Sequence, residues 1–327
     1  MRKRDVGLVA GLALLLVIIV PLGACFGDVK IPVSQVWEAL FNRTSSLNGE
    51  IVWEYRLPRI LVGMFVGANL AVSGALLQAV TQNPLAAPNV IGMTAGASLF
   101  AVLALLIIPH FPASGLPFAT FFGALFAGLC VYAFAWKKGM DKGRFALSGI
   151  AFDALFQAAV TGILVFATKG IDAAVIWLAG SLWGRTWEHV ALIVPWSVMG
   201  LALAYLCYRR LNVLQLHDDV AASLGMRVQA VRFLIFLIAV GLCGSAVAVS
   251  GPIGFVGLVI PHLARLLTRA DYQRLIPVSA LLGAMLMIGA DTVGRTIAAP
   301  IEIPVGILTA FIGAPYFLFL LRRAKLS

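Results

Sequence analysis

Charged residues are scarce in this chain. Asp, Glu, Lys and Arg make up 12% of its 327 residues, whereas hydrophobic residues make up 61%. Soluble domains carry about 25% charged and roughly 45–50% apolar residues. The composition therefore excludes an ordinary soluble domain, and the mean hydropathy of +0.99 agrees with this. We expect a chain that is embedded in a membrane.

Nucleotide-binding and catalytic motifs are also missing. The pattern G-x-x-x-x-G-K-[ST], which cradles the phosphates of ATP, occurs nowhere in the sequence, and no hydrolase or redox motif appears. We predict that the chain is not an enzyme and holds no cofactor of its own. Active transport would then draw its energy from a partner ATPase or from an ion gradient.

Cysteine and histidine form no recognisable metal or disulfide pattern. The four histidines are scattered, and the four cysteines contain no C-x-x-C pair. We predict neither a disulfide framework nor a metal site. The cysteines, which lie in or beside apolar runs, are Cys25, Cys130, Cys207 and Cys243.

Ten apolar runs approach the ~20 residues that a membrane-spanning helix needs. They predict an all-α, polytopic membrane protein whose helices form one compact bundle. The eighth run is short and glycine-rich, which indicates a broken or partial helix. The runs cover residues 7–25, 60–80, 91–109, 117–135, 145–167, 189–208, 230–250, 253–268, 276–297 and 304–321.

Positive charge predicts the orientation of these spans. The formal charge of +10 comes from small basic clusters between apolar runs, and no face is both basic and aromatic, so nucleic acid is not a predicted partner. If the N-terminal "MRKR" is cytoplasmic, most of the 24 lysines and arginines are cytoplasmic, as the positive-inside rule requires. Both termini are then cytoplasmic. Arg56, Arg59 and Arg295 fall on the outer side, where the rule leaves them unexplained.

The first run has an alternative interpretation. A basic start, an apolar stretch and "LGAC" (residues 22–25) are also typical of a bacterial lipoprotein signal, with Cys25 as the lipidated residue. Cleavage there would leave the orientation of the later spans unchanged.

Small residues recur at every fourth position in several spans. Gly63, Gly67, Ala71 and Ala75 form such a row in the second span, and Gly92 with Gly96 and Gly241 with Ser245 repeat the spacing. Small side chains in one row let two helices approach closely. We predict a tightly packed bundle.

Ionisable residues within the spans are candidates for function because they are costly in lipid. Asp153 lies near the middle of the fifth span and indicates either a hydrogen-bonded carboxyl in the bundle interior or a group on a transport pathway. A carrier driven by an ion gradient would be expected to hold several such groups. Asp291 and Arg295 are four residues apart, which predicts a local ion pair.

The longest polar connection runs from Arg209 to Arg232, between the sixth and seventh spans. Its apolar positions are interrupted by Asp218, Asp219 and Gly225, which predicts two short helices with a turn near Gly225. Such a segment either lies on the lipid headgroups or docks on a soluble subunit.

Five stretches of the sequence together resemble one known family. They are "RLPR" (56–59), "SGALLQAVTQNPLAAPNVIGMTAGAS" (73–98), "LQLHDDVAASLGM" (214–226), "GPIGFVGLVIPHLAR" (251–265) and "EIPVGILTAFIGAPYFLFLLRR" (302–323). In this order and spacing they closely resemble the permease subunits of bacterial ABC importers for iron-siderophores, haem and cobalamin. The resemblance runs nearly from end to end of the chain.

The resemblance implies a complete transporter around this chain, with residues 1–327 as one transmembrane permease domain. The partners would be a second copy or a paralogue, two ATPase subunits that bind ATP and Mg²⁺, a soluble or lipid-anchored substrate-binding protein, and membrane lipid. The location would be the bacterial cytoplasmic (inner) membrane.

The resemblance also assigns roles to residues. It implies that the binding protein docks on Arg56, Arg59 and Arg295, and that residues 209–229 form a cytoplasmic coupling segment. His217 stands where the family usually has Gly, which puts the local turn in question. A cytoplasmic gate would be formed by Asn83, Pro84 and Leu85, and the coupling contacts would be Leu214, Leu216, Asp218, Asp219, Ala222, Leu224, Gly225 and Met226.

The function that these features favour is that of an importer permease for an iron chelate of the siderophore type. A cobalamin or haem permease of the same family is the nearest alternative. A secondary transporter that works alone, and a purely structural membrane scaffold, are alternatives from other classes.

Overall fold

The computed structural model describes residues 3–42, 46–137, 139–269 and 271–323. Arg2, Arg43, Lys138 and Lys325, which contribute to the charge pattern of the sequence, lie outside these residues. The described part is helical and contains no strand beyond one isolated bridge between Trp136 and Met140. The predicted all-α class is confirmed.

Each of the ten predicted spans corresponds to a helix. Seven helical stretches are long and apolar enough to cross a membrane, and three shorter apolar helices complete the set. The eighth span is short, as predicted. The helices are α1 (Lys3–Cys25), α4 (Leu57–Thr81), α5 (Met93–Val102) continued by η2 (Leu103–Ile107), α6 (Leu116–Ala135), α7 (Lys142–Phe166), α9 (Trp187–Leu206), α12 (Val228–Ser250), α13 (Val256–Thr268), α14 (Tyr272–Gly294) and α15 (Val305–Arg323).

Seven shorter elements lie between these helices in the described residues. Five of them were not predicted from the sequence, because they are too short to give a clear apolar period. The predicted pair in the polar connection is present as α10 (Tyr208–Leu214) and α11 (Asp218–Ser223). The others are α2 (Val33–Asn42), α3 (Leu47–Glu50), η1 (Ile51–Arg56), η3 (Ala113–Gly115) and α8 (Ile171–Leu178).

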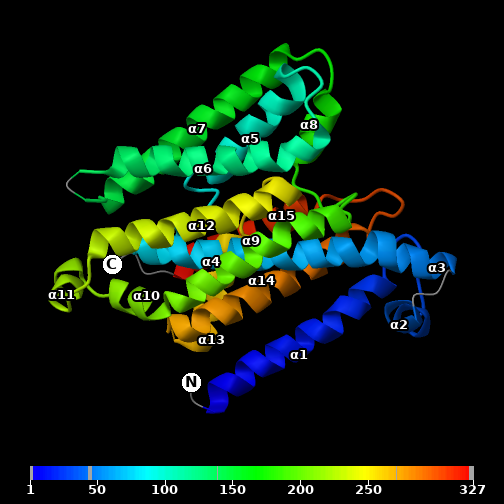
Figure 1. Ribbon diagram of the computed structural model, residues 1–327, viewed down its shortest axis with the longest axis horizontal. Coiled ribbons are helices and arrows are strands. Elements are labelled where there is room, and N and C mark those ends of the chain that lie inside the picture. Colours follow the sequence, from blue (N-terminus) through cyan, green and yellow to red (C-terminus); the bar gives the residue numbers. More distant parts are fainter. Residues whose placement is uncertain (1–2, 43–45, 138, 270, 324–327) are drawn as a thin grey trace.

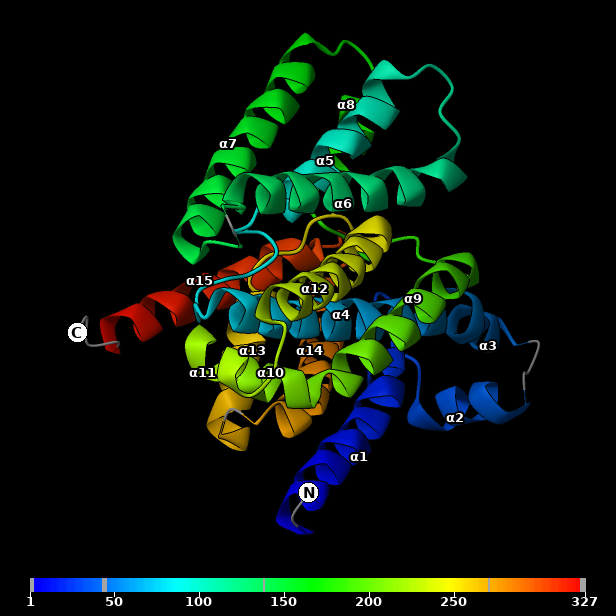
Figure 2. The same cartoon turned by 60° about the vertical axis from the view of Figure 1, so that its left-hand side comes forward.

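Helix α4 is the centre of the bundle. It contacts α9, α12, α13 and α14, and α1 packs on the outside of α14. Helices α5, α6, α7 and α8 form a second layer, which is joined to the first mainly through α6 and α12 (Figures 1 and 2). Almost every residue of α4 is buried, but in α7 the buried residues are Phe145, Gly149, Phe156 and Val160. The apolar sequence of α4 therefore serves internal packing, whereas most of α7 is left uncovered by this chain.

The predicted close packing is present at most of the small-residue positions. A Cβ atom added at Gly67 would lie 2.1 Å from the carbonyl oxygen of Gly283, so the backbones of α4 and α14 touch. A Cβ at Gly96 would lie 2.3 Å from that of Ala127. Gly241 differs, because it has no neighbour within 4 Å. The spacing in the sequence does not reveal which small positions face a helix.

The start of α1, the end of α15 and the α10–α11 segment lie on the same side of the bundle (Figure 1). This agrees with the prediction that the two termini lie on the same side of the membrane. Cys25, at the end of α1, is 6% exposed, and its thiol donates to the carbonyl of Pro21 at 3.3 Å. In this fold, residues 3–25 pack as a full helix of the bundle.

We expect Gly67→Ala to destabilise the protein by about 1–3 kcal/mol, because the new methyl group would overlap the carbonyl of Gly283. Thermal unfolding in detergent measures this. Gly241→Ala is the matched control: it lies inside α12 with open space around it and should leave stability unchanged or slightly higher. Equal stability of the two variants would contradict the close α4–α14 contact.

Candidate functional site

Arg59, near the start of α4, joins two distant carboxylates. Its Nε and Nη2 atoms donate to Asp291 of α14 at 2.8–3.0 Å, and its Nη1 donates to both oxygens of Glu302 at 2.8 and 2.9 Å. A guanidinium presents its donors in a planar fork that fits such paired contacts. Arg59 therefore ties α14 and the connection before α15 to the first turn of α4.

Two further arginines hold the end of α1. Arg56 donates from Nη1 to the carbonyl of Ala24 at 2.6 Å and from Nη2 to the carbonyl of Val29. Arg295 donates to the carbonyl of Gly23 at 2.6 Å. The last carbonyls of a helix have no partner within the helix, so these guanidiniums satisfy acceptors that burial would otherwise leave unpaired.

The three arginines are brought together as predicted, but they do not form an open basic surface. Arg56, Arg59 and Arg295 are 6%, 9% and 4% exposed, because Asp291, Glu302 and main-chain carbonyls occupy their donors. We call Arg56, Arg59, Asp291, Arg295 and Glu302 the Arg59 cluster. The expected local pair of Asp291 and Arg295 is present at 3.7 Å, but the shorter contacts of Asp291 are with Arg59.

A cavity of about 230 Å³ opens beside the Arg59 cluster and is lined by all three arginines, Glu302 and the Gly27–Val29 turn. The three guanidiniums are matched in number by the carboxylates of Asp28, Glu302 and Asp291. Burial lowers the pKa of Arg295 to about 10, with Asp291 acting in the opposite direction. The pKa of Arg185, which follows α8, is also lowered to about 10 by burial and by the charge of Arg59. Arg185 has no carboxylate partner in the described residues, and no spacing in the sequence predicts that it lies beside Arg59.

At the opposite end of α4, Gln82 connects three segments. It follows α4 in a left-handed conformation, with φ of 50°. Its Nε2 donates to the carbonyls of Leu214 and Leu216 at 2.7 and 3.0 Å, and its Oε1 accepts from Lys142 of α7 at 2.6 Å. The side chain thus links the end of α4, the α10–α11 segment and the start of α7.

Asp218 completes this second cluster. Arg232 of α12, whose side chain is fully buried, donates to both oxygens of Asp218 at 2.6 Å, and Lys142 lies 3.5 Å away. The hydrogen bonds from Arg232 are the main reason that the pKa of Asp218 is lowered. We call Gln82, Lys142, Asp218 and Arg232 the Gln82 cluster. The sequence did not predict it, because its members are distant in the chain and follow no common spacing.

The predicted gate residues form the turn next to Gln82. The side-chain oxygen of Asn83 accepts from the backbone N–H of Leu85 at 2.9 Å, and the N–H of Asn83 donates to the hydroxyl of Thr81 at 3.3 Å. Pro84 continues the turn, and Leu85 is exposed. The turn is therefore attached, through Gln82, to the predicted coupling segment.

The predicted coupling residues differ in exposure. Leu214 is buried in the core, so its side chain anchors the segment to this chain and does not face outward. Asp219, Ala222 and Gly225 are exposed, and Met226 is half-buried. Three apolar side chains spaced four apart point away from the bundle, namely Leu216, Val220 and Leu224 at 44%, 46% and 64% exposure.

The turn geometry in this segment resolves the question about His217. It precedes α11 with φ of −60° and ψ of 148°, an extended conformation that any residue adopts. Gly225, with φ of +81°, ends α11 in the left-handed region that favours glycine. The turn predicted near Gly225 is present, and the break between the two short helices lies at Gln215–His217.

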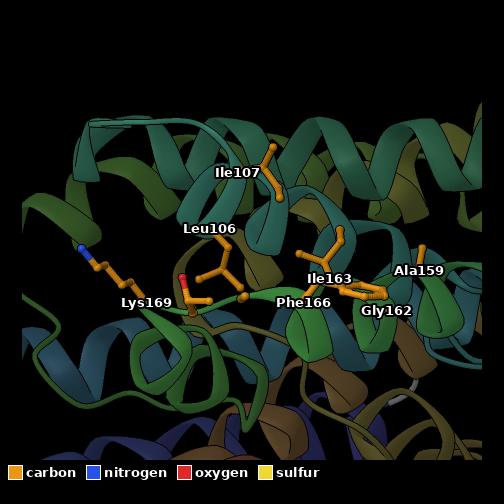
Figure 3. A pocket seen from close by; sticks show the side chains of 9 residues that line it. Leu106, Ile107, Ala159, Gly162, Ile163, Phe166 and Lys169 are labelled. Carbon is orange, nitrogen blue, oxygen red and sulfur yellow. The ribbon is translucent and has the colours of Figure 1, made fainter.

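A separate cavity of about 770 Å³ lies between η2 and the last turns of α7. Leu106 and Ile107 line it from η2, and Ile163 and Phe166 line it from α7, with Lys169 at one side (Figure 3). It shares no residue with either cluster. Asp153 of α7 is not among its lining residues.

The chain is similar to known proteins over almost its whole length. Residues 14–323 match the FecCD transport family. The Fe(3+)-citrate import system permease protein YfmE of Bacillus subtilis (strain 168) is 42% identical over 98% of this chain and 96% of its own length. The iron(3+)-hydroxamate import system permease protein FhuG of the same organism is 39% identical over 95% of each chain. A solved metal-chelate type ABC transporter in an inward-facing conformation shares 32% identity, with a TM-score of 0.87 over 97% of this chain and 99% of that chain.

We expect Arg59→Met to destabilise the protein by about 3–5 kcal/mol, because it leaves the buried carboxylate of Asp291 and the half-buried carboxylate of Glu302 without their shared cation. Arg59→Lys should lose less, since it keeps the charge but not the forked contacts. Unfolding in detergent measures both variants. Wild-type stability in Arg59→Met would show that the cluster does not hold α4, α14 and the Glu302 connection together.

Asp218→Asn should lower stability at neutral pH by about 2 kcal/mol, because buried Arg232 loses its counter-charge while the 39% exposure of Asp218 weakens the pair. A lowered carboxyl pKa stabilises the fold above the unfolded value of ~3.9, and this contribution is lost as pH falls through the folded value. The difference between wild type and variant should therefore shrink below about pH 4. Asp219→Asn, at an exposed neighbour, is the control. A difference that is constant with pH would contradict the ion pair.

Proposed function

Because the chain belongs to the FecCD transport family, we propose that it is the membrane-spanning permease of an ATP-driven importer for an iron(III) chelate. The observation that carries this is the match over residues 14–323, which includes both ends of α4 and the clusters there. The clusters lie at opposite ends of a 25-residue helix, about 37 Å apart along its axis. That distance is enough to cross a bilayer.

An iron chelate is favoured as the cargo by the names of the relatives. YfmE is named for Fe(3+)-citrate and FhuG for iron(3+)-hydroxamate, at 42% and 39% identity. Cobalamin or haem, the nearest alternative, is named in neither. Iron here would be carried as substrate within its chelator.

A separate ATPase is proposed to dock on the α10–α11 segment. The row of Leu216, Val220 and Leu224 presents apolar surface at the Gln82 end of the bundle, where a soluble partner would cover it. A displacement of this segment would act on Gln82 through the carbonyls of Leu214 and Leu216. Gln82 adjoins the predicted gate turn and bonds Lys142, so the same movement would reach Asn83 and α7.

A binding protein is proposed to dock at the Arg59 end. The side chains of Arg56, Arg59 and Arg295 are too buried for a flat basic contact, but they line a cavity that an acidic side chain of a partner would fit. Arg185, which lies beside Arg59, has no carboxylate partner in the described residues, and a carboxylate of the binding protein would supply one. In this arrangement the Arg59 end faces outward, and both termini are cytoplasmic.

The assembled importer is proposed to contain two permeases, two ATPase subunits and one binding protein. The sparse burial of α7 supports a second permease, because this chain leaves most of that helix uncovered. The proposed location is the cytoplasmic (inner) membrane.

Leu224→Asp should uncouple the transporter. A carboxylate in place of this apolar side chain would be buried without a partner at the ATPase contact, which costs several kcal/mol. Uptake of ferric citrate and of a ferric hydroxamate is measured in proteoliposomes that hold the permease, its ATPase and its binding protein. We expect ATP-dependent uptake by wild type and at least a roughly tenfold loss in Leu224→Asp.

Asp219→Asn changes a charge on the same exposed segment and serves as the control for Leu224→Asp. Gly225 is left intact, since any side chain there would strain the backbone. Normal uptake and normal co-purification of the ATPase with Leu224→Asp would contradict docking at this segment. Uptake without any ATPase would instead favour a secondary transporter.

A further inference from the structure

Helix α2 carries an apolar face that the described residues leave exposed. Val33, Trp37 and Phe41 follow one another at every fourth position and are 57%, 54% and 75% exposed. The rings of Trp37 and Phe41 contact each other edge-on, with their centroids 5.3 Å apart. Residues four apart lie on the same side of a helix, so these three side chains form one continuous surface. We call this surface the Trp37 face.

The remaining apolar side chains of α2 pack against this chain. Val36 and Ala39 are buried. They belong to one buried cluster with Cys25, the last residue of α1, and with Val52 of η1. Glu38 lies on a third side of α2 and is exposed. Helix α2 therefore has one side against the protein, one polar side, and the Trp37 face between them.

A hydrogen bond of Gln35 shows which side of α2 points away from the membrane. Its side-chain oxygen accepts from the side-chain amide of Asn48 in α3 at 2.7 Å. Residues Leu47–Thr81 run as one helical stretch, in which Asn48 lies one turn beyond Val52, so Gln35 points along this stretch and away from α4. Trp37 is two positions from Gln35, about 200° around the helix, so the Trp37 face points nearly the opposite way, toward the spans.

Helix α2 lies at the level where the spans end. Only seven residues separate it from Cys25. Figure 1 shows α2 almost end-on while α4 lies across the view, and Figure 2 shows α2 from the side, so α2 runs crosswise to the central span. Ile18 and Leu22 of α1 and the following Phe26 are also exposed, so the apolar surface of α1 continues to the turn before α2. A helix placed in this way is parallel to the membrane surface at the Arg59 end.

We propose that α2 is an interfacial helix whose Trp37 face is embedded in lipid, at the boundary between headgroups and acyl chains. Amphipathic helices in this zone bury their apolar side by about 5–10 Å, and tryptophan is enriched there because its ring is apolar and its N–H is polar. The turn before α2 contains Val29, whose carbonyl accepts from Arg56. The lipid contact therefore also fixes the depth of the Arg59 cluster in the membrane. This inference does not depend on the cargo.

Lipid fits the Trp37 face better than a soluble partner or a second permease does. Glu38 is the only charged residue from Val33 to Phe41, and it would repel the acidic partner proposed for the Arg59 end. The proposed second permease would cover α7, which lies on the other side of the first helix layer from α2 in both views (Figures 1 and 2). With no basic residue in this part of α2, the attraction to lipid is apolar and requires no anionic headgroup.

Fluorescence quenching from the lipid and from water tests the position of the Trp37 face. In a variant whose four native cysteines are replaced by alanine, Val33→Cys or the polar-side control Glu38→Cys carries one environment-sensitive fluorophore. The full chain is placed in phosphatidylcholine nanodiscs with acyl chains brominated near the headgroup. We expect these lipids to quench the label of Val33→Cys at least about threefold more than that of Glu38→Cys, and aqueous iodide to show the reverse order.

Other quenching patterns would overturn the proposal. Equal access of iodide to both labels would place the Trp37 face in water. Shielding of the Val33→Cys label from both quenchers would show that another protein, such as a second copy, covers it. Access of iodide that is lost only when the binding protein is added would assign the face to that partner.

Replacement of the central ring tests whether Trp37 itself holds α2 in lipid. We expect Trp37→Gln to reduce the bromolipid quenching of the Val33→Cys label at least about twofold, because the helix loses its largest apolar side chain in the interface. The affinity for the binding protein should change by less than about twofold, and Glu38→Gln is the control for both measurements. Unchanged quenching, or a tenfold loss of affinity for the binding protein, would contradict the lipid contact of Trp37.

Discussion

Helix α4 touches α13 and α14 through the backbone of glycine residues, with no side chain between. The rest of this structure depends on that constraint. Gly67 meets Gly283 of α14, and Gly74 meets Gly257 of α13, where an added Cβ would lie only 1.9 Å from a carbonyl oxygen. In a membrane, apolar side chains gain little from leaving lipid, so close packing of small residues stabilises helix association. Because α4 is enclosed in this way, its two ends are held in fixed positions, and both polar clusters are built there.

The Arg59 cluster and the Gln82 cluster join their segments through different kinds of interaction. At the Arg59 end, one guanidinium donates hydrogen bonds to two carboxylates that come from separate segments, and its neighbours Arg56 and Arg295 donate to carbonyls at the end of α1. That cluster is mostly buried and joins elements rigidly. At the other end, Gln82 makes neutral hydrogen bonds to main-chain carbonyls of an exposed segment. Such contacts contribute only ~1 kcal/mol each, so the link from α4 to the α10–α11 segment is weaker than the ion pair of Asp218 with Arg232 in the same cluster.

The sequence was sufficient to predict the ten spans, the short eighth helix and the family, and the family match confirms the motif resemblance. Span prediction succeeded because the length and apolarity of a helix are local properties. The same locality explains the errors. Asp291 was paired with Arg295, four residues away, but its closest partner is Arg59, 232 positions distant in the chain. The buried state of Arg56 and Arg59 was missed because hydropathy reports a charge but not the acceptors that a fold brings to it.

The distribution of polar groups along the membrane-spanning helices separates what holds the fold from what is left for function. Arg59 and Arg232 are charged and buried, and each donates at least two hydrogen bonds to carboxylates of this chain. Asp153 and Gln157 are polar and lie on α7, and their side chains have no hydrogen bond or ion pair in the described residues. Charge therefore joins helices at both ends of α4, whereas these two side chains of α7 take no part in holding the described residues together.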